Sequence, residues 1–189
     1  DVREEDWAIL QIFFATTQGD VRRNPLSDSA NVMRNGKCAM KLPEGTSLVN
    51  ARICREDDDV MLVTAMGKAI RFKTNDVRVF KGRDSTGVRG VRLAENDHVV
   101  SMAVIRHFVA SSEERAAYLK QRRAVAGADD EGADADADEP VADIALPPGR
   151  YAEMSAAEDL ILTITASGSG KLSSSHDYPV RGRGGQGVA

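Results

Sequence analysis

The chain has 189 residues and a net charge of -4; 29% of its residues are charged and only 5% are aromatic. Its two cysteines are too few for a disulfide framework and favour a reducing, cytoplasmic compartment, and no apolar stretch of about 18 residues predicts a transmembrane helix. The charge is uneven: residues 108–159 hold 13 acids and 5 bases, whereas the other 137 residues hold 16 acids and 20 bases.

The first part of the chain predicts short strands joined by glycine turns. Residues 9–16 are typical of a buried strand, and the turn at 18–20 closes a hairpin onto 21–23. Apolar and polar residues alternate over 37–42, which predicts a half-buried strand, and a further strand follows at 48–53.

The second part repeats this order with stronger signals. Strands are predicted at 60–64 and 69–73, on either side of a turn at 66–68. Two more follow at 88–93 and 99–105, which gives four short strands, the content of one propeller blade.

Glycine spacing sets the period of this repeat. Gly19 and Gly67 lie 48 residues apart, and Gly36 and Gly87 lie 51 apart. A period near 50 indicates propeller-like blades that share a core with their neighbours. We therefore predict an all-β, partial β-pinwheel or propeller-like array, whose function lies on a repeated surface.

An acidic insert interrupts the array. The predicted domains are two blades at 1–107, the insert at 108–159 and the start of a third blade at 160–189. Ser111 or Ser112 is a candidate cap for a helix at about 111–126, and the Ala/Asp-rich run at about 127–140 is expected to be disordered. The insert is either a tolerated surface loop or an acidic competitor for the basic blades.

No catalytic, metal or cofactor site is predicted. Residues 168–171 resemble a phosphate loop but lack its first glycine, its Ser/Thr and its helix. The three aspartates at 57–59 are interpreted as a solvated turn. The three histidines are scattered along the sequence and have no carboxylate or cysteine at catalytic or metal-binding spacing. They are His98, His107 and His176.

Basic residues form the remaining candidate site, because they recur at matching points of successive repeats. Alternation along residues 69–73 predicts that Arg71 and Lys73 face water. Equivalent positions in an array lie on equivalent edges, so the bases would make a continuous track suited to a phosphate backbone. A merely solubilising role is the alternative. The predicted DNA-binding residues are Lys68, Arg71, Lys73, Arg83, Arg89, Arg92, Lys171, Arg181 and Arg183.

Two phrases of the second repeat, 66–73 and 85–93, closely resemble the C-terminal domain of the A subunit of bacterial DNA gyrase. The resemblance covers about 1–107 and 160–189. It implies a six-bladed β-pinwheel with swapped strands, whose basic rim wraps duplex DNA in a positive sense to support ATP-dependent negative supercoiling by a type II topoisomerase.

The resemblance also implies partners and cofactors. The partners are double-stranded DNA, the rest of the gyrase A subunit and, through it, the gyrase B subunit, in the cytoplasmic nucleoid. Tyrosine chemistry, ATP and magnesium belong elsewhere in the holoenzyme, so this chain is expected to be non-catalytic and to hold no cofactor. It is also expected to be a piece of a longer protein, since it begins at Asp1 and stops just after the third glycine phrase begins.

A gyrase-specific box, Gln-Arg-Arg-Gly-Gly-Lys-Gly, belongs to a first blade that we expect to lie outside this chain. Residues 181–187 match four of its seven letters, with Arg183 at the second arginine. Residues 82–87 keep only the arginine and the last glycine. The alternatives are the equivalent domain of topoisomerase IV and a propeller-like scaffold that binds proteins.

Overall fold

The computed structural model describes residues 3–30, 32–126 and 145–188, so the run at 127–140 lies outside the described residues. The contacts divide the chain into two units. The first contains 1–105 and 180–189, and the second contains 106–179.

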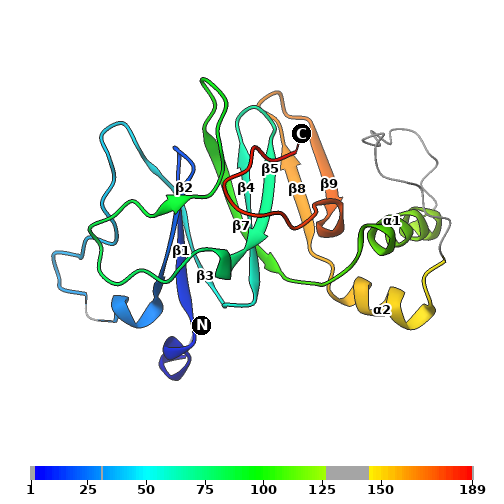
Figure 1. The fold of residues 1–189 in the computed structure, drawn as a ribbon, viewed down its shortest axis with the longest axis horizontal. Coiled ribbons are helices and arrows are strands. Elements are labelled where there is room, and N and C mark those ends of the chain that lie inside the picture. Colours follow the sequence, from blue (N-terminus) through cyan, green and yellow to red (C-terminus); the bar gives the residue numbers. More distant parts are fainter. Residues whose placement is uncertain (1–2, 31, 127–144, 189) are drawn as a thin grey trace. The chain divides into compact units, whose positions relative to one another are not determined.

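The first unit is built from two antiparallel sheets (Figure 1). One has the strand order β3-β1-β2-β6, and the other β5-β4-β7. The strands are β1 (Gln11–Thr16), β2 (Asp20–Pro25), β3 (Leu48–Cys54), β4 (Asp58–Thr64), β5 (Ala69–Lys73), β6 (Val88–Arg89) and β7 (Val99–Arg106). Short 3-10 helices lie at η1 (Glu4–Ala8), η2 (Leu26–Ser29) and η3 (Thr74–Asp76).

One turn type closes all three hairpins. A glycine N–H donates at 3.0 Å to the carbonyl of a threonine three residues earlier. These glycines have a positive φ, which costs glycine little. They are Gly19 (81°), Gly67 (80°) and Gly168 (87°). Residues 168–171 are therefore part of a hairpin, as their sequence indicated.

We call the short segments centred on Gly36, Gly87 and Gly187 the glycine phrases. The second and third of them pair with the hairpin of the preceding repeat. In β6, Val88 and Arg89 pair with Val21 and Asp20 of β2. Val188 forms the equivalent bridge to Ala69 of β5, with N–O distances of 2.7 and 2.8 Å. The swapped strands that the resemblance implied are thus present.

Two strand predictions need correction. Residues 37–42 form no strand, and only Val88–Arg89 of the stretch 88–93 is a strand. The pairing explains the first error, because a glycine phrase extends an earlier hairpin and none precedes 37–42 in the described residues. Met40 is nevertheless buried, as the alternation predicted.

The two sheets share one hydrophobic core. Phe13 of β1 and Phe72 of β5 are fully buried, with ring centroids 6.3 Å apart. Val91, from the segment after β6, is buried in the same cluster. Burial of apolar surface drives folding, so neither hairpin depends on its own side chains alone.

The second unit contains two helices and one hairpin. Its elements are α1 (Ser112–Ala126), α2 (Pro148–Ala156), β8 (Leu160–Ile164), β9 (Gly170–Ser174) and the 3-10 helix η4 (Ser175–Asp177). Within the described ranges, no helix combines the length and hydropathy needed to cross a bilayer. Of the stretch predicted as the start of a third blade at 160–189, β8 and β9 lie in the second unit and residues 180–188 in the first.

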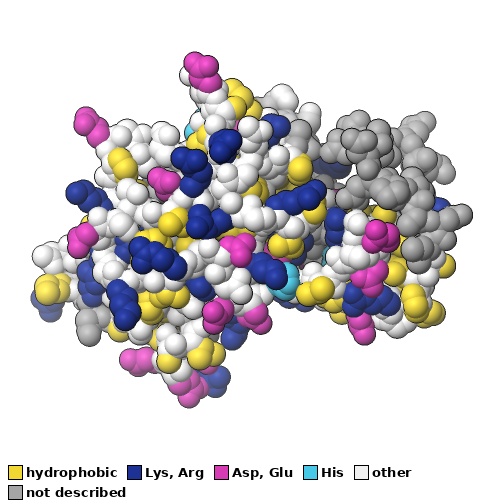
Figure 2. All heavy atoms as spheres, viewed as in Figure 1, with side chains coloured by type: hydrophobic (Ala, Val, Ile, Leu, Met, Phe, Trp, Pro, Cys, Tyr) yellow, Lys and Arg dark blue, Asp and Glu magenta, His cyan; other side chains and the backbone are white. Residues whose placement is uncertain are grey.

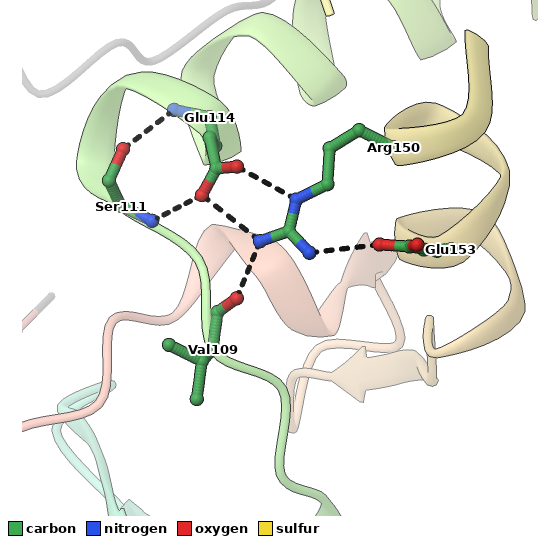
Figure 3. A network of polar contacts seen from close by, with 5 residues as sticks. All are labelled: Val109, Ser111, Glu114, Arg150 and Glu153. Atoms are coloured by element: carbon green, nitrogen blue, oxygen red, sulfur yellow. Dashed lines mark hydrogen bonds and ion pairs between the residues drawn. The ribbon is translucent and has the colours of Figure 1, made fainter. Parts of the chain in front are cut away.

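An arginine fastens the two helices (Figure 3). Arg150 Nε lies 2.7 Å from Glu114 Oε1, and its Nη2 donates to the Val109 carbonyl at 2.7 Å. Glu114 also accepts the Ser111 N–H at 2.9 Å, while Ser111 Oγ accepts the Glu114 N–H at 3.2 Å. These reciprocal bonds are a capping box, so Ser111 is the cap at the start of α1.

A close backbone approach makes Gly87 the most demanding turn position. Its φ is 101°, and a Cβ there would lie 2.1 Å from the Val21 carbonyl oxygen. Gly36, at φ 81°, has no heavy atom within 4 Å of such a Cβ. We predict that Gly87→Ala lowers the free energy of unfolding by about 3 kcal/mol or more, and Gly36→Ala by about 1 kcal/mol.

Urea denaturation followed by circular dichroism measures both variants. Equal losses would show that the close approach at Gly87 contributes nothing beyond backbone strain.

Candidate nucleic-acid interface

Two segments of the first unit, which we call linking segments, each follow the second strand of a hairpin, β5 or β9, and the short 3-10 helix after it. The first (residues 77–87) bridges β2 through Val79 and Arg23, and the second (residues 180–187) bridges β5 through Val180 and Arg71. The backbone N–H of the next residue donates in both cases, from Phe80 to the Arg23 carbonyl and from Arg181 to the Arg71 carbonyl, each at 2.8 Å. The repeat in sequence is therefore a repeat in hydrogen bonding.

Each linking segment meets an earlier glycine phrase, and we call these contacts the first junction (36–42 with 82–86) and the second junction (87–93 with 181–187). In the first, Lys41 N–H donates to the Arg83 carbonyl at 3.0 Å. In the second, Arg92 N–H donates to the Gly185 carbonyl at 2.8 Å. Lys41 and Arg92 each lie five residues after their glycine, Gly36 and Gly87.

The second junction gathers four of the predicted bases, all exposed: Arg89, Arg92, Arg181 and Arg183. Arg183 links its own segment to two earlier parts of the chain. Its Nε donates to the Asp76 carbonyl at 2.9 Å and its Nη1 to the Arg89 carbonyl at 3.1 Å. The Gly184 N–H donates to the Gly90 carbonyl at 2.6 Å. Part of the box-like loop at 181–187 is thus packed against backbone.

The first junction also carries bases. Arg83 is half-buried, and its Nη2 lies 3.4 Å from the Asp28 carbonyl oxygen. Lys37 Nζ donates to the same oxygen at 3.0 Å. Figure 2 shows many Lys and Arg side chains spread over the visible face, with Asp and Glu side chains among them.

Arg71 is a correction to the predicted track. It is only 4% exposed, and its Nε lies 2.8 Å from Oδ2 of Asp59, which is fully buried. Asp59 is therefore no solvated turn residue either. The prediction that Arg71 faces water was wrong because both faces of β5 are covered by protein.

The other predicted bases are more separate. Lys68 is half-buried at the β4–β5 turn, and Lys73 is exposed where β5 ends. Lys171 is exposed on β9 of the second unit. The junctions are thus the places in the first unit where the described bases gather.

An acid accompanies Arg89. Asp20 is its cross-strand partner in the pairing of β2 with β6. Burial raises the pKa of the Asp20 carboxyl, and the charge of Arg89 opposes that rise. This carboxylate reduces the positive potential at one edge of the second junction.

A family profile described as "DNA gyrase C-terminal domain, beta-propeller" matches residues 11–55, 58–106 and 159–189. The chain belongs to the DNA gyrase C-terminal domain family.

Similar proteins agree with this family. The DNA gyrase A subunit of Granulibacter bethesdensis is 49% identical and that of Rickettsia bellii 40% identical, each over 98% of this chain. The chain spans about a fifth of these curated relatives, 21% and 20% of their lengths. The DNA gyrase A subunit of Escherichia coli is 41% identical over 97 residues, or 51% of this chain.

Two solved structures share the fold. A DNA gyrase A C-terminal domain aligns with a TM-score of 0.61 at 18% identity, over 96% of this chain and 43% of that one. The C-terminal domain of a DNA topoisomerase IV aligns with the same TM-score at 17% identity, over 95% of this chain and 40% of that one. The β-pinwheel or propeller fold predicted from the sequence is confirmed.

The insert stands apart from the family profile, whose match leaves out residues 107–158. The alignment with the Granulibacter protein nevertheless covers 98% of the chain and therefore runs through this region.

The buried ion pair yields a stability prediction. Arg71→Gln removes the guanidinium charge from the buried Asp59 carboxylate, so we expect the free energy of unfolding to fall by about 3 kcal/mol. Lys73→Gln, two residues on and exposed, should change it by less than about 0.5 kcal/mol. Urea denaturation of both variants tests this; an unaltered stability in Arg71→Gln would place the guanidinium at the surface instead.

Proposed function

We propose that this chain binds duplex DNA through its phosphates, without reading bases, and wraps it as part of the A subunit of a DNA gyrase. The observation that carries the proposal is the recurrence of bases at two equivalent junctions. Hydrogen bonding repeats there together with charge, so both junctions of the first unit offer positive charge beside a similar backbone contact. A phosphate backbone is the ligand with a matching regular charge.

The bases assigned to this surface are the exposed and half-exposed members of the predicted set. In the first unit they are Lys68, Lys73, Arg83, Arg89, Arg92, Arg181 and Arg183, and Lys171 of the second unit is proposed as a separate phosphate contact. Arg71 is left out, because a buried guanidinium paired with Asp59 is not available to a phosphate.

The rest of the enzyme enters this proposal through the relatives. Their name, that of the DNA gyrase A subunit, supports placing the chain in a type II topoisomerase, in a non-catalytic part. Its partners are then the remainder of the A subunit together with the gyrase B subunit, ATP and magnesium act elsewhere, and the cytoplasmic nucleoid is the site of action. The alternative is that the chain comes from a topoisomerase IV. The fold similarity to a topoisomerase IV domain is equal, but the relatives reported above are named as DNA gyrase A subunits.

Salt dependence tests the phosphate contacts. Each neutralised phosphate contributes about 0.9 to the slope of log K against log salt. The double variant Arg89→Gln and Arg92→Gln should therefore flatten the slope by about 1.8 for a short duplex, measured by fluorescence anisotropy between about 50 and 200 mM salt.

A matched control removes the same kind of charge elsewhere. Arg3→Gln affects an exposed arginine that pairs with Glu5 outside the junctions, and it should leave the slope unchanged. Equal slopes in all three proteins would place the DNA path away from the second junction.

Wrapping requires a separate measurement, since binding alone does not imply it. If nicked circular DNA is sealed by ligase while the chain is bound, a positive wrap should leave topoisomers with a raised linking number. The shift should grow with the protein-to-DNA ratio and shrink as salt weakens the phosphate contacts. A linking-number distribution equal to that of protein-free DNA would mean binding without wrapping.

A further inference from the structure

Strand β2 carries three polar side chains that are buried instead of exposed. Arg22, Arg23 and Asn24 are 1%, 4% and 6% exposed. Both arginines belong to the basic series of the sequence, yet neither faces solvent. Burying a charged group is costly unless hydrogen bonds compensate it, so their partners indicate what these side chains do.

Arg22 binds the first linking segment at two points. Its Nη2 donates to the Gly82 carbonyl and its Nη1 to the Ser85 carbonyl, the latter at 2.5 Å. Its Nε donates to Asn24 Oδ1 at 2.8 Å. The planar fork of the guanidinium thus fixes both ends of the stretch 82–85 relative to β2.

Asn24 and Arg23 form further hydrogen bonds to backbone carbonyls of the same linking segment. Asn24 Nδ2 donates to the Phe80 carbonyl at 2.8 Å and to the Gly82 carbonyl at 3.2 Å. Arg23 Nε donates to the Val77 carbonyl at 2.5 Å. Carbonyl oxygens from 77 to 85 are therefore bound by three consecutive side chains of one strand.

The environment of Arg22 explains how its charge is tolerated. Its Cζ lies 5.2 Å from the centroid of the Phe80 ring. Burial lowers the pKa of Arg22 from its ordinary value, and the charge of Asp84 opposes this. Arginine nevertheless stays protonated in proteins, so the side chain keeps every donor that the linking segment uses.

Arg83 lies between the two anchored carbonyls and faces a second cation. Its Nη2 and the Lys37 Nζ both lie within 3.4 Å of the Asp28 carbonyl oxygen. Two cations that share one oxygen repel each other, and the charges of Asp28 and Asp84, which also act on Arg22, offset part of this positive charge. An anion between Lys37 and Arg83 would relieve the repulsion that remains. Lys37 is exposed and Arg83 half-buried, so a phosphate can reach the pair.

The second junction lacks this support. Ile70 stands where Arg22 stands in the first repeat, since both lie six residues after the turn threonines Thr64 and Thr16. A Cβ on Gly185 would lie 3.7 Å from Ile70 Cδ1, so that segment rests on an apolar side chain. Ile70 and Phe72 thus stand at the β5 positions that match Arg22 and Asn24, so these two polar side chains have apolar counterparts in the second repeat.

We propose that Lys37 and Arg83 form a clamp for one phosphate of the DNA backbone, and that buried Arg22 is the positioning residue that holds Arg83 in it. The inference rests on the proposed function. It adds Lys37 to the predicted site and gives Arg22 a positioning role instead of a phosphate contact.

The salt slope tests the clamp. Because both bases neutralise the same phosphate, the double variant Lys37→Gln and Arg83→Gln should flatten the slope by about 0.9. An unchanged slope, or a fall near 1.8, the value for two separate phosphates, would overturn the shared clamp. Arg3→Gln again serves as the control for a lost charge outside the junctions.

A conservative variant tests the positioning role. Arg22→Lys keeps the charge but loses the fork, so it should weaken binding nearly as much as Arg83→Gln. Adding Arg83→Gln to Arg22→Lys should then cost little more, because both changes remove one contact. Wild-type affinity in Arg22→Lys, or fully additive losses, would overturn this role.

Hydrogen exchange decides the matter even if Arg22→Lys does not fold. In the wild-type chain, bound duplex should slow amide exchange in both 37–41 and 83–86. Absence of protection in both stretches, while DNA binding persists, would overturn the clamp and leave the proposed function standing. Failure of the wild-type chain to bind duplex at low salt would instead refute the proposed function itself.

Discussion

The structure depends on the pairing of each glycine phrase with the hairpin of the preceding repeat. Val88 and Arg89 complete the sheet of β2, and Val188 bridges β5 in the same manner. Gly87 permits this pairing, because no side chain fits beside the Val21 carbonyl. The exchange joins neighbouring repeats by backbone hydrogen bonds as well as by a common core, and it places bases from two repeats at one junction.

Much of this arrangement could be predicted from the sequence. The turn glycines, the hairpins and the period near 50 are local signals, and the structure has all of them. The sequence of residues 37–42 predicted a strand that does not form. Its alternating pattern indicates which side chains are buried, but it does not show whether a neighbouring strand is available for pairing. Met40 is buried there although the backbone forms no ladder.

The candidate site shows a different limit. Alternation predicts two faces of a strand, but it cannot predict whether the second face meets water or protein. Arg71 and Arg22 both occupy strands with two covered faces, so they bind Asp59 and backbone carbonyls instead of solvent. A signal for Arg71 was present in Asp59, an acid within the neighbouring strand. Nothing local to Arg22 indicates its two carbonyl partners, Gly82 and Ser85, which lie 60 and 63 residues away.

The two junctions also show how a repeated surface can vary without a change of fold. The backbone contacts are similar, since Lys41 and Arg92 donate from matching positions to the linking segment of the next repeat, at Arg83 and Gly185. The supports beneath them differ, since Arg22 and Asn24 hold one linking segment whereas Ile70 underlies the other. A rigid polar support orders a basic loop before an anion arrives, which reduces the entropy lost on binding. Under the proposed function, substitutions at these buried positions would adjust the phosphate affinity of one junction while the exposed bases and the sheet pairing stay the same.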